Sequence, residues 1–217
     1  MKTVFVYPEQ CIGCKQCEFA CAVAHSQSKN QYLAALESPL PKPRIHAEPG
    51  FAYATSFPNK CRHCDPAPCQ MVCPTNAIQR AADFPEIVLI ESLKCIACGM
   101  CAIVCPFDAI SFYPVANAPG KKNVAVKCDG CIGRQQQGLQ PACVEACKAS
   151  ALRFGDLNEL IQQARGRYSW EVSAAINLGS GGEKTGVAAR LPGSVREWRD
   201  WGKVVSALNA NGKKERA

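Results

Sequence analysis

The chain has 217 residues, of which 25 are Lys or Arg and 18 are Asp or Glu, so its formal net charge is +7. This length allows one or two domains with a hydrophobic core. No apolar stretch reaches the roughly 18 residues needed to cross a bilayer, so we expect no membrane span in the chain itself. Positive charge is typical of nucleic-acid-binding proteins, but no basic segment is interleaved with aromatic residues, and we expect no nucleic-acid partner.

The chain begins with a short strand-like run, Met1–Tyr7. This run lacks the apolar core and the small-residue cleavage site of a secretory signal peptide. We therefore expect a cytoplasmic protein, in a compartment where thiols stay reduced.

Sixteen cysteines follow in four runs of four: Cys11, Cys14, Cys17 and Cys21; Cys61, Cys64, Cys69 and Cys73; Cys95, Cys98, Cys101 and Cys105; Cys128, Cys131, Cys143 and Cys147. The first and third runs read C-x2-C-x2-C-x3-C, the second widens one gap by two residues, and the fourth has a gap of eleven residues. Three cysteines so spaced bind one iron–sulfur cube, and the fourth reaches a second cube. The sequence therefore predicts four [4Fe–4S] clusters and a function in electron transfer.

Two other uses of cysteine fit this spacing less well. Disulfides are typical of short secreted chains, and no signal peptide is present. Zinc sites use C-x2-C pairs a dozen or more residues apart, often with His, and have no use for a third close cysteine. The spacing therefore favours iron–sulfur clusters over zinc, and zinc over disulfides.

Bound clusters would change the net charge of the protein. A [4Fe–4S] cluster with its four thiolates carries about −2, so four of them contribute about −8 and bring the holoprotein to about −1. The excess of Lys and Arg is then explained as compensation for buried anionic clusters.

The runs also belong to an internal repeat, because CPTNAI at 73–78, CPFDAI at 105–110 and CKASAL at 147–152 match one another. Each repeat predicts a cysteine loop, a one-turn helix and a returning strand. Glycines give the loops tight conformations, and prolines end the helices. These residues are Gly13, Gly99, Gly130, Pro74 and Pro106.

In a two-cluster ferredoxin, the fourth cysteine of each run completes the cluster of the partner run. The second and third runs, which are close in sequence, are expected to exchange in this way, giving Cys61, Cys64 and Cys69 with Cys105, and Cys95, Cys98 and Cys101 with Cys73. The first and fourth runs then pair across them, giving Cys11, Cys14 and Cys17 with Cys147, and Cys128, Cys131 and Cys143 with Cys21.

The expected fold is α+β, with two bacterial-ferredoxin-like two-cluster modules, one inserted in the other, and a C-terminal helical extension. The outer module is expected over residues 1–58 plus 111–156, and the inserted module over 59–110. The extension is expected over 157–217, where cysteine no longer occurs.

The segment from Gln27 to Asn59 is rich in proline. Composition of this kind predicts an extended segment that lies on a surface. Such a segment would cover the first cluster or contact a partner, and composition leaves both open.

The C-terminal extension is expected to contain two helices. The first, Asp156–Arg165, is followed by a flexible linker over Gly179–Gly186. The second, Ser194–Leu208, is amphipathic and places Trp198 and Trp201 on one face. We expect this face to dock either on the chain's own body or on a partner subunit.

Histidines and basic residues beside the cysteines point to tuning of the clusters, and no catalytic residue is expected. None of the histidines has a positioned carboxylate or serine partner in the sequence, so we expect structural roles, with His63 close to a cluster. The basic residues would either raise a cluster's potential or lie in solvent. The residues concerned are His25, His46, His63, Lys15, Arg62, Lys94 and Lys127.

On these motifs, the chain resembles the family of four-cluster iron–sulfur subunits over residues 1 to about 156. That family includes the electron-transfer subunits of formate dehydrogenase, hydrogenase, polysulfide reductase and dimethyl sulfoxide reductase, and the ferredoxin-like partner of anaerobic carbon monoxide dehydrogenase. CAVAHSQSKN at 21–30 and GLQPACVEACKASALRFGDLNEL at 138–160 are most similar to the last of these.

The resemblance implies a relay of single electrons between a catalytic redox subunit and an acceptor such as a hydrogenase. The favoured catalytic partner is a nickel carbon monoxide dehydrogenase. The alternative is a molybdenum or tungsten oxidoreductase, such as formate or aldehyde dehydrogenase. Two further hypotheses stay open: a stand-alone polyferredoxin, and a structural subunit whose clusters do not change oxidation state.

Overall fold

The computed structural model describes the chain except for residues 51–54, 116–119, 121–122 and 180–217. It divides the chain into two units, Met1–Asp156 and Leu157–Ala217. All sixteen cysteines lie in the first unit.

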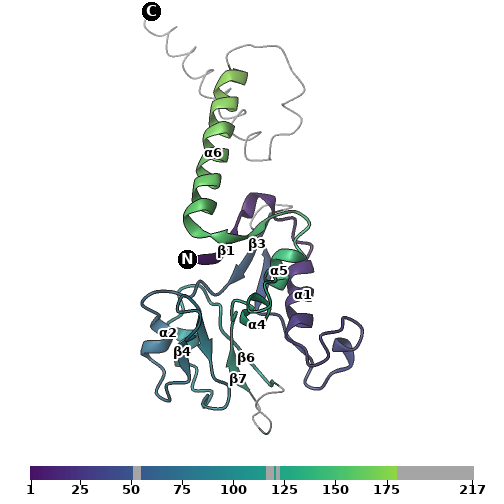
Figure 1. The fold of residues 1–217 in the computed structure, drawn as a ribbon, viewed down its shortest axis with the longest axis vertical. Coiled ribbons are helices and arrows are strands. Elements are labelled where there is room, and N and C mark those ends of the chain that lie inside the picture. The colour runs from purple at the N-terminus through teal and green to yellow at the C-terminus, as the bar shows by residue number, and fades with distance from the viewer. Residues whose placement is uncertain (51–54, 116–119, 121–122, 180–217) are drawn as a thin grey trace, which may run out of the picture. The chain divides into compact units, whose positions relative to one another are not determined.

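The described part of Met1–Asp156 is built from short helices and two-stranded antiparallel sheets, which confirms the α+β class (Figure 1). The paired strands are β1 (Lys2–Val6) with β8 (Leu152–Asp156), β2 (Ile45–Pro49) with β3 (Ser56–Lys60), β4 (Ile78–Arg80) with β5 (Val88–Ile90), and β6 (Ser111–Tyr113) with β7 (Val124–Val126). The helices are α1 (Gln16–Ala24), α2 (Pro68–Met71), α3 (Met100–Ile103), α4 (Ile132–Gln135) and α5 (Ala142–Glu145), with single 3-10 turns at η1 (Pro8–Gln10) and η2 (Ala34–Leu36).

The predicted repeat of loop, one-turn helix and returning strand is confirmed in three of the four runs. The helices α2, α3 and α5 have four residues each and lead into β4, β6 and β8. In the first run the helix continues for nine residues, to Ala24. The reason is local, because Cys21 is followed by Ala22 where the second and third runs have a proline that cannot continue a helix.

Two groups of buried apolar residues form the core of this unit. The larger group joins residues between Ala67 and Val126, and contains members of β4, β5 and β7. The smaller group joins the N-terminal part of the chain to its later part, because Cys17, Cys21 and Ile45 lie with Cys143 and Leu152. Residues more than a hundred positions apart in sequence therefore share one core.

The segment from Gln27 to Asn59 was expected to lie extended on a surface; in its second half the extended backbone is confirmed by β2 and β3, but the surface position is wrong. β2 and β3 pair with each other, and Ile45 and Ala47 of β2 are buried in the smaller core. The two side chains are two positions apart, so the pleat of the strand turns both to the same face. Proline is tolerated here because Pro49 ends β2 and Pro58 lies in a sheet of only two strands, where each strand has a free edge.

The second unit contains α6 (Leu157–Gly179), a helix of 23 residues. It begins where the sequence predicts a helix, but it continues well past Arg165. An ion pair between Arg167 and Glu171, one turn apart at 3.8 Å, supports the additional turns. Gly179, predicted to start a linker, is its last residue; residues 180–186 and the predicted helix Ser194–Leu208 lie outside the described residues. Among the helices that the structure describes, none is long and apolar enough to cross a membrane.

The burial of β2 leads to a stability prediction. Ile45 is 2% exposed, so Ile45→Ala should lower the free energy of unfolding by about 2–5 kcal/mol through lost burial and a cavity. The measurement is anaerobic urea unfolding of the cluster-loaded protein. Ile103→Ala is the control, because Ile103 is 78% exposed and its truncation should cost little. Equal losses in the two variants would contradict the assignment of β2 to the core.

Candidate iron–sulfur centres

All sixteen cysteines have free thiols. Every one of them lies in the described part of the chain, and none forms a disulfide. The disulfide interpretation of the sequence is therefore excluded in this structure. The thiols remain available as ligands.

The second and third runs contribute to two separate cavities. One is lined by four thiols that we call the Cys105 set: Cys61, Cys64, Cys69 and Cys105. The other is lined by four thiols that we call the Cys73 set: Cys73, Cys95, Cys98 and Cys101. In each cavity the fourth cysteine of one run lies with the first three of the other. These are the combinations expected from exchange, and their binding of a cluster stays a prediction.

The first and fourth runs meet in the smaller core, where Cys17 and Cys21 lie with Cys143 and Cys147 packs against them. Burial raises the pKa of the Cys17 thiol to about 11, and the charges of Glu18, Cys11 and Cys147 add to that rise. Burial also raises the pKa of Cys21, with Cys128 and Cys131 adding to it. Cys17 therefore lies near Cys147, and Cys21 lies near the fourth run.

The expected ligand groups of these two runs are named in the same way. The Cys147 set is Cys11, Cys14, Cys17 and Cys147, and the Cys21 set is Cys21, Cys128, Cys131 and Cys143. Cys14 is exposed, and so is Cys98 of the Cys73 set.

Strand pairing explains how two of the sets assemble. Val6 of β1 pairs with Leu152 of β8, and Cys11 and Cys147 each lie five residues beyond that pair. Ile78 of β4 pairs with Ile90 of β5, and Cys73 and Cys95 likewise lie five residues beyond it. In both cases five residues separate each cysteine from the paired strand position, so the two pairs of cysteines are brought together in the same way.

Burial sets the protonation of these thiols. It raises the pKa of Cys101 and of Cys131 to about 11 each, and raises that of Cys143 well above its usual value. A thiol of that kind stays protonated at neutral pH, whereas a metal ligand must be a thiolate. Loading these sites therefore releases protons, and the bound metal has to offset the cost of the buried charge.

Backbone conformation in the loops aims N–H groups at sulfur. The residue two positions after the first cysteine of each run has a positive φ: 68° at Gly13, 52° at His63, 56° at Ala97 and 66° at Gly130. The amides of His63, Ala97 and Gly130 each donate to the preceding first cysteine's Sγ at 3.4 Å. At Gly130 a Cβ would also lie 2.6 Å from Ile87 Cδ1, so a larger residue has no room.

Two further N–H donors come from distant segments and were missed by sequence reasoning. The amide of Ala125 in β7 donates to Cys95 Sγ at 3.4 Å, and the amide of Arg44 donates to Cys21 Sγ at 3.3 Å. Hydrogen bonds from N–H groups stabilise negative charge on sulfur. Clustered thiols with N–H donors suit an anionic iron–sulfur cluster, so the residues fit the group that their spacing predicts.

Comparison with known proteins identifies the family. Residues 52–157 match the 4Fe-4S dicluster domain. An iron–sulfur protein of Rhodospirillum rubrum is 37% identical over 175 residues, which cover 76% of this chain and 88% of the relative. The chain belongs to the family of 4Fe-4S electron-transfer proteins.

Two other relatives extend this picture. The electron transport protein HydN of Escherichia coli is 38% identical over 162 residues, covering 70% of this chain and 87% of its own. The probable anaerobic dimethyl sulfoxide reductase chain YnfG of Escherichia coli strain K12 is 34% identical over 173 residues, covering 73% of this chain and 75% of its own. As a member of this family, the protein is an iron–sulfur electron-transfer protein that binds 4Fe-4S clusters.

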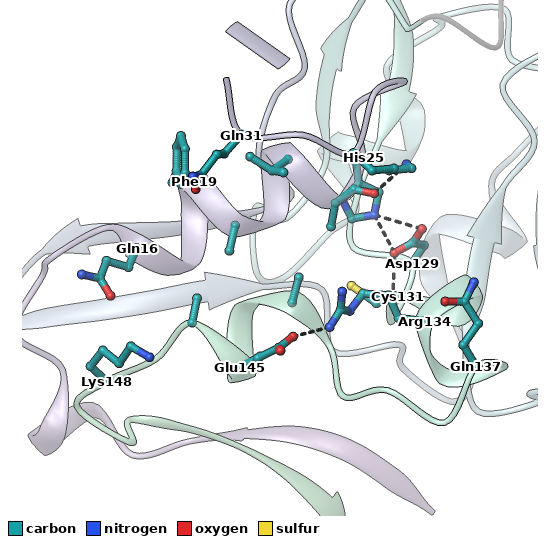
Figure 2. A pocket seen from close by; sticks show the side chains of 17 residues that line it. Gln16, Phe19, His25, Gln31, Asp129, Cys131, Arg134, Gln137, Glu145 and Lys148 are labelled. Atoms are coloured by element: carbon teal, nitrogen blue, oxygen red, sulfur yellow. Dashed lines mark hydrogen bonds and ion pairs between the residues drawn. The ribbon is translucent and has the colours of Figure 1, made fainter. Parts of the chain in front are cut away.

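In this iron–sulfur protein, a polar network joins the first and fourth cysteine runs. Figure 2 shows the His25 ring facing Asp129, and its Nε2 lies 3.1 Å from Asp129 Oδ1. Arg44 Nη1 lies 2.7 Å from the other carboxylate oxygen, and the Cys131 amide donates to Asp129 at 2.9 Å. His25 Nδ1 faces the Cys21 carbonyl oxygen at 2.7 Å. The network thus ties α1 to the loop of the fourth run.

The protonation of Asp129 follows from this network. Burial alone would raise the pKa of its carboxyl, but the hydrogen bond and charge of His25, the Arg44 guanidinium and the Cys131 amide outweigh burial. Together they hold the pKa of Asp129 well below its usual range. The carboxylate therefore stays charged at neutral pH, and its stabilising contribution is lost only in strong acid.

A hollow of about 920 Å³ opens beside this network, between α1 and α5 (Figure 2). Phe19 of α1 and His25, the residue after α1, line one side of it, and Cys131 of the fourth run lines the other. An ion pair between Arg134 and Glu145 crosses from α4 to α5. One thiol of the Cys21 set therefore lies at the wall of a hollow.

The basic residues beside the cysteines fall into three groups. Lys15 and Lys94 are exposed and pair with Glu18 at 4.0 Å and Glu91 at 2.7 Å. Arg62 lies over the rings of Phe57 and Phe107, 5.5 Å from each centroid. Lys60 and Lys127, in contrast, are buried. Lys60 was missed by sequence reasoning, although it precedes Cys61 just as Lys94 precedes Cys95.

The exchange of cysteines makes a prediction about pairs of substitutions. Cys61→Ala and Cys105→Ala together should remove one cluster, or about four irons per chain, because both thiols belong to one set. Cys95→Ala and Cys105→Ala together should remove two clusters, or about eight irons, because they belong to different sets. Iron and sulfide analysis of the anaerobically purified variants measures this.

Cys105→Ala alone is the control, with an expected loss of about four irons. The reverse pattern for the two double variants would mean that each run completes its own cluster.

The Asp129 network makes a second prediction. Asp129→Asn should lower the free energy of unfolding at neutral pH by about 1–3 kcal/mol, because it leaves Arg44 without its charged partner. Asp65→Asn is the matched control, since Asp65 pairs with Arg80 at 2.8 Å but is fully on the surface. Anaerobic urea unfolding compares them, and an equal effect of both changes would argue against a structural role for the network.

Proposed function

We propose that this protein carries four [4Fe–4S] clusters and relays single electrons between a catalytic redox subunit and an acceptor. The observation that carries the proposal is the convergence of four thiols, drawn from two runs, on each of two cavities. The electrostatic contacts of Cys17 and Cys21 support the same arrangement for the first and fourth runs.

The chain's own contribution is ligation, electrostatics and exclusion of water. A [4Fe–4S] cluster supplies the redox chemistry by accepting and releasing one electron. Thiolates of each set would hold it, and the amides of His63, Ala97, Ala125 and Gly130 would offset negative charge on the ligating sulfurs. Buried surroundings limit the access of water and so influence the reduction potential.

We also propose the nested arrangement of two ferredoxin-like modules, with residues 59–110 inserted between 1–58 and 111–156. The two separate core groups support it. Val124–Val126 of β7 belongs to the larger core, so in this proposal β7 packs on the inserted module. Residues 157–217 form the extension, and the segment around Trp198 and Trp201 is its candidate docking element.

For the catalytic partner we favour a nickel carbon monoxide dehydrogenase, on the sequence resemblance at residues 21–30 and 138–160. A molybdenum or tungsten oxidoreductase is the second candidate. It is supported by the likeness to YnfG, whose name is that of a probable anaerobic dimethyl sulfoxide reductase chain. A hydrogenase is a possible acceptor in either case.

Composition of the purified complex tests the function. The protein is isolated anaerobically from its native cells, and iron, sulfide, nickel, molybdenum and tungsten are assayed. We expect about sixteen irons and sixteen sulfides per copy of this chain in addition to those of any partner. Nickel in the complex would support carbon monoxide dehydrogenase, and molybdenum or tungsten would move the assignment to the second candidate.

Two other outcomes would overturn the relay between subunits. A monomer containing only iron would indicate a stand-alone polyferredoxin. Clusters that keep one oxidation state throughout a redox titration would indicate a structural subunit. Fewer than about sixteen irons in the fully loaded protein would overturn the count of four clusters.

A further inference from the structure

Two buried lysines lie next to the cysteine ligands, at equivalent places in their runs. Lys60 precedes Cys61 and is 3% exposed, and Lys127 precedes Cys128 and is 4% exposed. Lys94 precedes Cys95 in the same way, but its side chain is 52% exposed and pairs with Glu91. The position before the first cysteine of a run therefore holds a buried lysine in two runs and an exposed lysine in a third.

The hydrogen bonds of the two buried ammonium groups go to backbone carbonyls. Lys60 Nζ donates to the Cys61 carbonyl oxygen at 3.2 Å. Lys127 Nζ donates to the carbonyl oxygens of Cys128, at 3.3 Å, and of Val88. Within the described residues no carboxylate forms an ion pair with either lysine, although Lys15 and Lys94 each have one. The backbone oxygens satisfy the donors but supply no compensating negative charge.

Burial of an uncompensated cation is costly, so an anion is expected close by. The carboxylate of Asp129 acts on the same groups as the lysines, but it already pairs with His25 and Arg44. Thiols line the cavities of both lysines: Cys128 lies with Lys60, and the four thiols of the Cys105 set lie with Lys127. Burial raises the pKa of Cys128 and of Cys143, and the Lys60 ammonium opposes that rise at both. Burial also raises the pKa of Cys69, and Lys127 opposes it.

Each of the two lysines precedes one run but lies beside thiols of another. Lys60 precedes the second run but lines a small cavity with Cys128 of the Cys21 set, whereas Lys127 precedes the fourth run and lines the cavity of the Cys105 set. His63 lies with them: burial, Lys127 and Lys60 lower its pKa to about 3. Both lysines therefore lie between these two sets of thiols.

We propose that Lys60 and Lys127 form a cationic junction that raises the reduction potentials of the clusters bound by the Cys105 set and the Cys21 set. The inference rests on the proposed four-cluster relay. Each reduction adds one negative charge to a cluster, and a buried cation nearby stabilises the more negative state. The cluster of the Cys73 set has only the solvent-exposed Lys94 at the equivalent position, so it does not receive this effect. Electrons consequently settle on the clusters of the Cys105 set and the Cys21 set rather than on that of the Cys73 set.

The test uses anaerobic redox titration of the cluster-loaded full chain, followed by electron paramagnetic resonance. Lys60→Gln and Lys127→Gln keep an N–H donor for the backbone carbonyl and remove the charge. In each variant we expect the equilibrium constant for reduction of a cluster to fall about tenfold, which is about 59 mV for a one-electron couple. Lys60→Gln should act most on the Cys21 set, and Lys127→Gln most on the Cys105 set.

Lys94→Gln is the matched control and should leave all potentials unchanged. Cys105→Ala combined with Lys127→Gln assigns the signal, because the shift should vanish with the cluster that carries it. Unchanged potentials in both fully loaded glutamine variants would overturn the junction.

Iron content separates this proposal from the proposed function. An incomplete complement in the unmodified chain would overturn the four-cluster relay, whatever the lysine variants do. If a glutamine variant fails to bind its full set of clusters, Lys60→Arg and Lys127→Arg are measured next. Full cluster loading with arginine but not with glutamine would show that a positive charge is needed at that position. Equal loss of clusters with both would overturn the junction, because size and not charge would then matter.

Discussion

The antiparallel pairing of β1 with β8 is the constraint on which the arrangement of the first unit depends. It joins the two ends of Met1–Asp156, and the terminal amino group continues the contact with Asp156 at 3.0 Å. Val6 pairs with Leu152, and Cys11 and Cys147 each lie five residues along the chain from this pair. This strand pairing therefore holds the first and fourth runs close enough to share a core. The pairing of β4 with β5 likewise brings Cys73 close to Cys95, within the segment proposed to be inserted.

Charge is the second requirement, and the structure meets it with groups of two kinds. Loop amides with positive φ offer N–H donors to the first cysteines, and this works with any residue that accepts the left-handed conformation at a modest cost. Full positive charges in the interior are rarer, because an isolated ammonium ion is expensive to bury. Lys60 and Lys127 are buried and form no ion pair with a carboxylate among the described residues, and in the proposed junction the clusters supply the compensating negative charge.

Local sequence predicts the parts of this structure that depend on a few neighbouring residues. Cysteine spacing, glycine in the loops and proline after the fourth cysteine are enough to predict the one-turn helices and the returning strands. The meeting of the first and fourth runs was also expected from the cysteine pattern, but other contacts between distant residues were not predictable. The amide of Ala125 reaches Cys95 only because β7 packs beside the third run, and Lys60 differs from Lys94 only in what surrounds it. β2 was missed because the prolines in and before it outweighed the alternation of Ile45 and Ala47.

The contacts between the sets also order them in space. The thiols of Cys69 and Cys101 influence each other electrostatically and α2 packs on α3, which places the Cys105 set beside the Cys73 set. On the other side, α1 carries both Cys17 and Cys21 and packs on α5, which places the Cys21 set beside the Cys147 set. With the two buried lysines between the Cys105 and Cys21 sets, the series runs from the Cys73 set to the Cys147 set.

The exposed thiols, Cys98 and Cys14, belong to the two ends of this series. Electron transfer to another protein requires a short distance from the cluster to the surface. On the proposed ligation, the two end clusters are therefore the ones best placed to exchange electrons with partners. On the same ligation, the two middle clusters lie beside Lys60 and Lys127, and we expect them to serve transfer within the chain.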